Sequence, residues 1–155
     1  GGPRIDKLAK IGKDNYNLPY PLDDDSYNFS FSGIKSATLN LVHNEKQRGN
    51  KIIIEDVACS FQNRVVTVIA KKTFKAIKEY HVNNLIVAGG VAANTCLREK
   101  LSELAHENNV NLSIPRINYC TDNAAMIGAA AYYAYQNGII SDLYLNAKAV
   151  TDLYN

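Results

Sequence analysis

The segment from Leu85 to Arg98, LIVAGGVAANTCLR, constrains the fold more than any other part of this sequence. A continuous apolar run is followed by two glycines and an asparagine, and then by residues whose leucines recur at helical spacing. Such a run is typical of a strand buried on both faces, and glycines permit a tight turn from a strand into a helix. Because a strand of this kind needs layers that cover it, the segment favours an α/β domain.

The rest of the chain supplies further elements of the same kind. The periodicity predicts a partly parallel sheet with helices packed on its faces, because strands and helices alternate along the second half. Helices are expected over residues 5–11, 34–43 and 52–80, in the leucine-bearing segment that NNVN ends, and over 121–138; strands are expected at NFSFSG (28–33), LIVA (85–88) and NLSIP (111–115).

Composition restricts the class of protein. A chain of 155 residues with 46% hydrophobic residues suits one domain with a real core. The formal net charge of +2 gives no reason by itself to expect nucleic acid or an anionic membrane as a partner. Three scattered cysteines do not form a disulfide framework, which favours a reducing cytosol. No signal peptide or apolar run of membrane-spanning length is found, so we expect no membrane association.

Two turns carry residues that could bind a ligand. Gly89, Gly90 and Asn94 stand where a phosphate or a ribose could dock against backbone N–H groups at a helix N-terminus. The alternative is that the glycines only permit the turn and Asn94 only caps the helix. Asp122, in CTDNAA, is either a hard oxygen ligand for a metal or a cap shared with Thr121.

The start of the chain offers a third such place. Gly1, Gly2 and Pro3 could form a backbone cradle with the carboxylate of Asp6 one turn later, or could be a flexible start. No complete transition-metal site can be built from local motifs, because the three histidines are isolated and the cysteines show no CxxC. The sequence also has no nucleophile elbow and no Walker loop.

Taken in order, four segments resemble the signatures of one known family. GGPRIDKLA, NFSFSGIKSA, LIVAGGVAANTCLR and CTDNAAMIGAAA are similar to the motifs of the TsaD (Gcp) family, the tRNA threonylcarbamoyladenosine synthases. The resemblance runs from Gly1 to about Gly138. It implies an actin-like fold of the sugar kinase/Hsp70/actin superfamily, in which two α/β lobes surround a ligand cleft. Residues 51–155 would be the C-terminal lobe, and residues 1–50 the segment that leads into it from an N-terminal lobe absent here.

The resemblance also implies an activity and residue roles. The family transfers a threonylcarbamoyl group from threonylcarbamoyl adenylate to the exocyclic amine of the adenine 3′ of the anticodon in ANN-decoding tRNAs. By position in the motifs, Gly2, Asp6 and Asn94 would contact the adenylate, and Asp122 would bind one divalent metal, iron(II) in the first place and zinc as the alternative. The other two metal ligands are histidines of an HxxxH motif in the absent lobe, so this chain alone is expected to be inactive. Ile34 and Ser36 stand where the family often has leucine and threonine.

Partners and rival functions follow from the same resemblance. The expected partners are threonylcarbamoyl adenylate, tRNA, a TsaB-like inactive paralogue and a TsaE-like ATPase, in the cytoplasm. One rival is the carbamoyltransferase domain of hydrogenase maturation, which has similar motifs. A second rival is the non-catalytic paralogue that acts as a scaffold, although an intact metal-ligand aspartate argues against it.

Overall fold

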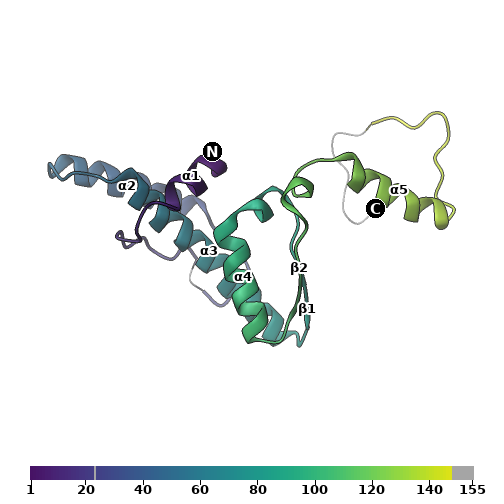
Figure 1. The fold of residues 1–155 in the computed structure, drawn as a ribbon, viewed down its shortest axis with the longest axis horizontal. Helices are drawn as coiled ribbons and strands as arrows, with labels where there is room; N and C mark the ends of the chain where they lie inside the picture. Colours follow the sequence, from purple (N-terminus) through teal and green to yellow (C-terminus); the bar gives the residue numbers. More distant parts are fainter. Residues whose placement is uncertain (23, 148–155) are drawn as a thin grey trace. The chain divides into compact units, whose positions relative to one another are not determined.

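The computed structural model describes residues 1–22 and 24–147 and divides into two compact units, with the boundary between Cys120 and Thr121 (Figure 1). The described part of the second unit contains one helix, α5 (Ala124–Gln136). The first unit combines helices with a small parallel sheet, which confirms the predicted α/β class. Its elements are α1 (Gly2–Ala9), α2 (Ser32–Gln47), α3 (Ile54–Glu79), β1 (Asn84–Ile86), the 3₁₀ helix η1 (Gly90–Ala93), α4 (Thr95–Glu107), β2 (Asn111–Ser113) and the 3₁₀ helix η2 (Ile117–Tyr119).

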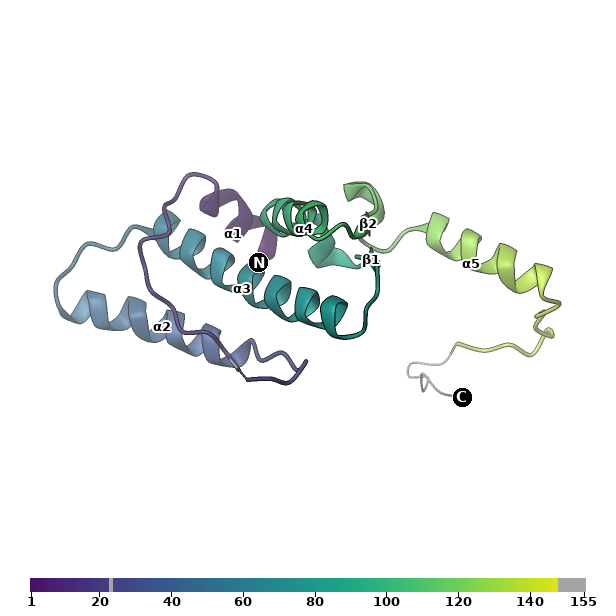
Figure 2. The same cartoon turned by 90° about the horizontal axis from the view of Figure 1, so that it is seen from below.

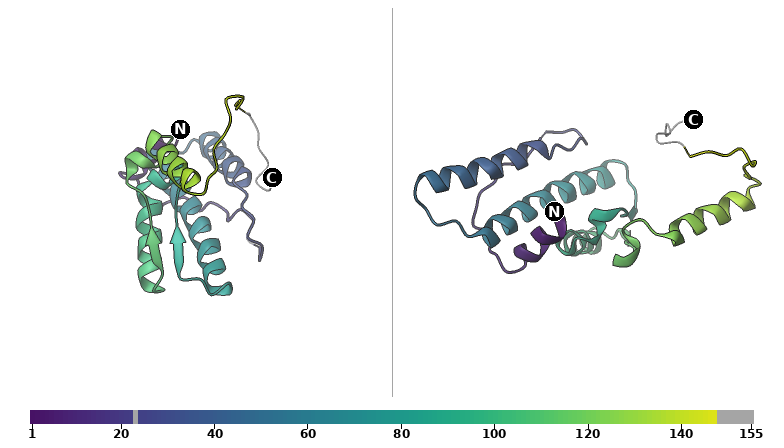
Figure 3. Two further views of the ribbon diagram at one scale, coloured as in Figure 1. Left: turned by 90° about the vertical axis from the view of Figure 1, so that its right-hand side faces the viewer. Right: turned by 90° about the horizontal axis from the view of Figure 1, so that it is seen from above.

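The long helix α3 organises the first unit. Figures 2 and 3 show α2 running along one side of α3, while α1 and α4 lie on the other. This helix, predicted over residues 52–80, is confirmed, but its predicted last residue, Tyr80, is 66% exposed. Tyr80 follows the last residue of α3, so its side chain does not belong to the buried face of the helix. The buried stripe advances in steps of four residues: Ala58, Gln62, Val66, Ala70 and Phe74.

The sheet consists of two parallel strands, β1 and β2. In the sequence, α4 lies between them. Leu85 lies opposite Leu112, and both pack against the core that α3 and α4 share. Ile86 alternates to the opposite face and is 78% exposed. The prediction that the LIVA strand is buried on both faces is therefore wrong for this unit, because α3 and α4 cover the same face.

The strand predicted at NFSFSG does not form. The chain is irregular up to Phe31 and enters α2 at Ser32. Phe29 and Phe31 do lie on one side, with ring centroids 5.9 Å apart and planes 8° from parallel. No strand among the described residues pairs with this segment. Instead, the ammonium group of Lys72 donates hydrogen bonds to the carbonyls of Ser26 (2.9 Å) and Asn28 (2.7 Å).

In the second unit, α5 begins later than the sequence predicts. The side chain of Asn123 caps it by accepting a hydrogen bond from the backbone N–H of Met126 at 3.1 Å. Gly138 ends the helix with φ of +72°, a left-handed conformation that favours glycine, as predicted for this position. None of the helices in the described parts of the chain has the length and apolar character that crossing a membrane requires.

Candidate functional site

The turn after β1 leaves an open space beside the backbone. Gly89 adopts φ of +90°, which side chains rarely tolerate, and its carbonyl accepts the N–H of Ala92 at 3.0 Å to start η1. A Cβ added at Gly89 or Gly90 would meet no atom within 4 Å. Gly89 is thus needed for the backbone conformation, while Gly90 borders free volume.

Asn94 joins the end of this turn to two other helices. Its side-chain oxygen accepts the N–H of Leu97 at 2.9 Å and so caps α4. Its amide nitrogen donates to Asp6 on α1 at 3.2 Å and to Gln62 on α3 at 2.8 Å. The prediction that Asn94 caps the helix is therefore correct. It is incomplete, because the amide nitrogen of Asn94 also links α4 to α1 through Asp6.

Asp6 is the acidic centre of this arrangement. Its carboxylate accepts from the hydroxyl of Thr95 at 3.1 and 3.2 Å and lies 3.6 Å from the ammonium group of Lys10. The side chain of Asp6 is 18% exposed. A carboxylate that neighbours hold in place but do not cover can accept hydrogen bonds from a ligand hydroxyl.

A cavity of about 530 Å³ brings the three predicted adenylate-binding residues together. Gly2 and Asp6 come from α1, and Asn94 comes from the start of α4. The volume lies within the usual range of about 300–1,000 Å³ for small-molecule sites. Its complete lining is Gly2, Pro3, Asp6, Gly90, Val91, Ala93, Asn94 and Ile117.

The cavity lies beyond the carboxyl ends of the two parallel strands. Val91 follows β1 and Ile117 follows β2, and both line it. Ligands of open α/β sheets bind at this edge, where the strand-to-helix turns gather. Arg98 ties the two turns together, because its guanidinium donates to the carbonyls of Ala92 (2.7 Å) and Pro115 (2.9 Å).

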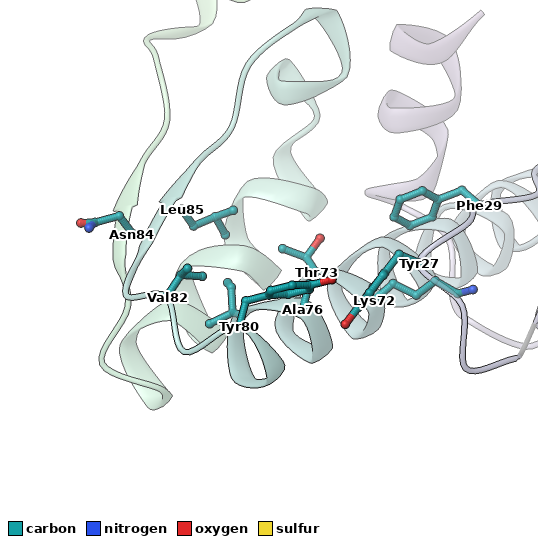
Figure 4. Close-up of a pocket in the computed structure, with 10 residues that line it drawn as sticks. Tyr27, Phe29, Lys72, Thr73, Ala76, Tyr80, Val82, Asn84 and Leu85 are labelled. Atoms are coloured by element: carbon teal, nitrogen blue, oxygen red, sulfur yellow. The ribbon is translucent and has the colours of Figure 1, made fainter.

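A second groove, of about 460 Å³, lies between the 27–29 segment, the end of α3 and β1 (Figure 4). Figure 4 shows the rings of Tyr27, Phe29 and Tyr80 together with the aliphatic side chains of Val82 and Leu85. None of the predicted site residues lines this groove. The surface of this groove is almost entirely apolar, whereas the lining of the cavity beside Asp6 includes the polar side chains of Asp6 and Asn94.

Asp122 belongs to the second unit. It is exposed, and it does not cap α5, since Asn123 does so. Capping was one of the two readings of Asp122, and this reading is wrong. The side chain of Asp122 is an exposed carboxylate, and carboxylate oxygens are ligands that hard divalent cations prefer. This fits one oxygen ligand of a metal.

No complete metal site exists in the parts of the chain that the structure describes. No three histidine, cysteine or acidic side chains converge there in a way that could hold an ion. Burial raises the pKa of the Cys59 thiol, with the carboxylates of Asp14 and Asp56 adding to the effect. Burial likewise raises the pKa of Cys96. Both thiols are thus poor nucleophiles near neutral pH.

Sequence reasoning missed Gln62, Thr95 and Arg98. Thr95 and Arg98 lie inside LIVAGGVAANTCLR, but nothing in the motif alone reveals that they contact Asp6 or Pro115. The position of Gln62 could have been recognised from the sequence. It is the only polar residue in the four-residue steps from Ala58 to Phe74, which indicates a polar side chain facing a core.

Comparison with known proteins decides the family. The model of the family described as TsaD, tRNA N6-adenosine threonylcarbamoyltransferase, matches residues 1–129. The chain belongs to this family. The match covers the first three of the four segments that resembled TsaD and the first residues of the fourth, so the resemblance seen in the sequence is confirmed.

Curated TsaD proteins of staphylococci extend this match to nearly the whole chain. The relative from Staphylococcus haemolyticus is 55% identical over 154 residues, which are 99% of this chain and 45% of the relative. A relative from Staphylococcus epidermidis is 54% identical and one from Staphylococcus carnosus 52% identical, with the same coverage. All three are named tRNA N6-adenosine threonylcarbamoyltransferase. The chain spans slightly less than half the length of these TsaD proteins.

Proposed function

We propose that this chain supplies the second part of a tRNA threonylcarbamoyltransferase. The reaction is transfer of a threonylcarbamoyl group from threonylcarbamoyl adenylate to the exocyclic amine of the adenine 3′ of the anticodon in ANN-decoding tRNAs. One observation carries the proposal: Gly2 and Asp6 line one cavity with Asn94, which is far from both in the sequence. The names of the relatives supply the tRNA and the group transferred.

The cavity has the features that an adenylate needs. The carboxylate of Asp6 is an acceptor for ribose or threonyl donors, and the small residues Gly2, Gly90 and Ala93 leave room for the ligand to approach the backbone. Threonylcarbamoyl adenylate is a mixed anhydride that is already activated at its carbonyl. The main task of this part of the site is therefore to hold the adenylate and align it with the tRNA amine.

The metal belongs to the same proposal. Asp122 would provide one oxygen ligand to a divalent ion, iron(II) in the first place or zinc, and the remaining ligands would come from outside this chain. When bound, such an ion polarises a carbonyl or phosphate oxygen as a Lewis acid. Because Asp122 would be only one of its ligands, we expect residues 1–155 to be inactive alone.

The architecture and the partners are inferred from the family. We infer that residues 51–155 contribute to an actin-like lobe, with residues 1–50 leading into it. A TsaB-like paralogue, a TsaE-like ATPase and a cytoplasmic location complete the proposal. The parallel pair β1–β2 with α4 between them in sequence is compatible with such a lobe.

A full-length chimera provides the test. This chain would replace the matching 45% of the Staphylococcus haemolyticus relative, and modified nucleoside would be measured by mass spectrometry with synthetic adenylate, unmodified tRNA and the partner proteins. The unaltered relative is the positive control. Transfer by the chimera supports the proposal, and no transfer while the relative works contradicts it.

Two substitutions in the chimera locate the site. Asp6→Asn removes the charge at constant volume and should lower kcat/KM for the adenylate by about a hundredfold, since a hydrogen bond to a charged group is worth roughly 1.5–3 kcal/mol. Asp25→Asn makes the same chemical change at a fully exposed aspartate, which pairs with Lys75, and should leave kcat/KM unchanged. Equal effects of the two variants would contradict a binding role for Asp6.

A further inference from the structure

Helix α3 carries four buried polar side chains, and three of them anchor loops. Asp56 accepts from the backbone N–H of Lys13 and the amide of Asn15, both at 2.8 Å. Ser60 accepts from the N–H of Tyr16, and Lys72 holds the 24–28 loop. The fourth is Gln62, whose side chain contacts Asn94 at the start of α4 rather than a loop.

Gln62 instead contacts a residue of the candidate site. Its side chain is buried, with 8% of the residue exposed, and its oxygen accepts the amide of Asn94 at 2.8 Å. Burying an amide costs free energy unless it is hydrogen-bonded. A leucine or a methionine would fill the same place in the Ala58-to-Phe74 stripe without that cost, so packing alone does not explain a glutamine here.

The contact determines which way the Asn94 amide faces. The oxygen of Asn94 is fixed by the N–H of Leu97, and one N–H of the amide is fixed by Gln62. Only the second N–H then faces Asp6 and the cavity. Without the acceptor on Gln62, the Asn94 side chain would keep its cap but lose the restraint on its nitrogen.

We propose that Gln62 is a positioning residue for adenylate binding, which acts by orienting the amide of Asn94 toward Asp6 and the cavity. The inference rests on the proposed function, because it assigns Gln62 to the same site. It names a residue on a third element, α3, in addition to those on α1 and at the start of α4.

The test compares two variants of the full-length chimera. Gln62→Met keeps the length of the side chain and removes the acceptor. Ser60→Ala is the matched control, because it removes a buried hydrogen bond of the same helix that serves only the Tyr16 loop. Gln62→Met should raise KM for the adenylate about tenfold, the usual scale for one lost hydrogen bond, with KM for tRNA unchanged. Ser60→Ala should lower the thermal midpoint and leave both KM values unchanged.

A double-mutant cycle shows whether Gln62 acts through Asn94. In the Asn94→Ala background, Gln62→Met should add less than a twofold change in KM for the adenylate. A full tenfold effect in that background would overturn the proposal. An unchanged KM for the adenylate in Gln62→Met alone would also overturn it, as would a rise in both KM values that follows the loss of folded protein.

A readout without catalysis separates this inference from the proposed function. In the chimera labelled with ¹⁵N-asparagine, the side-chain signals of Asn94 are identified by their loss in Asn94→Ala. Those signals should shift in Gln62→Met and stay in place in Ser60→Ala. If the chimera fails to transfer but the signals shift in this way, the proposed function fails while the positioning contact stands. Unshifted signals in Gln62→Met overturn the inference whether or not the chimera is active.

Discussion

The amide nitrogen of Asn94 lies 3.2 Å from the carboxylate of Asp6, although 88 residues separate them in the sequence. This contact links the first helix of the chain to the helix that follows the glycine turn. It places a donor and an acceptor side by side at the wall of a cavity of about 530 Å³. The pairing therefore makes one ligand-sized site out of two distant sequence motifs.

Capping and ligand contact by Asn94 can be separated by two substitutions. Asn94→Ala should lower the free energy of unfolding by about 1 kcal/mol, because the N–H of Leu97 loses its acceptor. Asn94→Ser keeps a good cap and should restore most of that stability. In both variants the side chain at position 94 lacks the amide that donates to Asp6, so both should raise KM for the adenylate in the chimera. Denaturant unfolding and kinetics measure the two effects, and recovery of KM by Asn94→Ser would show that Asn94 is only a cap.

Arg98 should stabilise the pair of turns at the carboxyl ends of the strands. Arg98→Lys should cost about 2 kcal/mol, since one ammonium cannot reproduce the fork that reaches both Ala92 and Pro115. The same substitution at Arg48, which makes an exposed ion pair with Glu45, should change stability by less than about 0.5 kcal/mol. Urea unfolding of the two variants checks this, and equal stabilities would contradict the role of Arg98.

Lys72 should hold the loop before α2. Lys72→Met removes the donor from the carbonyls of Ser26 and Asn28 and should lower the free energy of unfolding by about 2 kcal/mol. Cleavage in the 24–28 loop by a protease should become faster. Lys78→Met, at an exposed position of the same helix, is the control and should behave like the parent. Unchanged cleavage in Lys72→Met would show that the loop is held by other contacts.

The ion pair between Asp24 and Lys72 should make stability depend on pH. The hydrogen bond from Lys72 lowers the pKa of Asp24, and a further bond from Ser26 acts in the same direction. The folded-state pKa is then below the unfolded one, so the stabilisation is present above about pH 4 and is lost as the pH falls through the folded pKa. Thermal midpoints of the parent and Asp24→Asn should differ at pH 6 and converge toward pH 2. A difference that persists at pH 2 would contradict this origin.

The thiols of Cys59 and Cys96 should react slowly with alkylating reagents. Burial raises the pKa of both, so the thiolate is scarce at pH 7.5. Iodoacetamide labelling followed by mass spectrometry should give rates below that of free cysteine, and unfolding in urea should remove the difference. Rates for the folded chain that equal those of free cysteine would contradict the prediction.

The sequence was sufficient for the elements whose pattern is local. The strand, glycine turn and helix of LIVAGGVAANTCLR were predicted from apolar runs and leucine spacing, and the structure confirms them. NFSFSG shows where such patterns fail. Alternation indicates that a segment can form a strand, but it does not show whether a partner strand lies beside it. Here Lys72 binds the backbone carbonyls near this segment instead.

The residues of the site were predictable only in part. Gly2, Asp6 and Asn94 came from motifs, and the structure places them around one cavity. Their role as adenylate ligands stays a prediction, as does that of Asp122 as a metal ligand. Thr95 and Gln62 could not be assigned, because their importance depends on contacts across 89 and 32 residues of sequence. Such contacts are a product of helix packing and leave little trace in local sequence.

The place of α3 between α1 and α4 in the chain fixes when this site can form during synthesis. A ribosome adds about 5–20 residues per second, so Asp6 emerges roughly 4–18 s before Asn94. Helix α3 is complete 15 residues before Asn94 and can then receive α1, with which it packs in the finished unit. The two acceptors of the Asn94 amide, on Asp6 and Gln62, can therefore come together before the glycine turn and Asn94 leave the ribosome. A nascent chain stalled before Asn94 would carry the acceptor side of the site and lack its donor side.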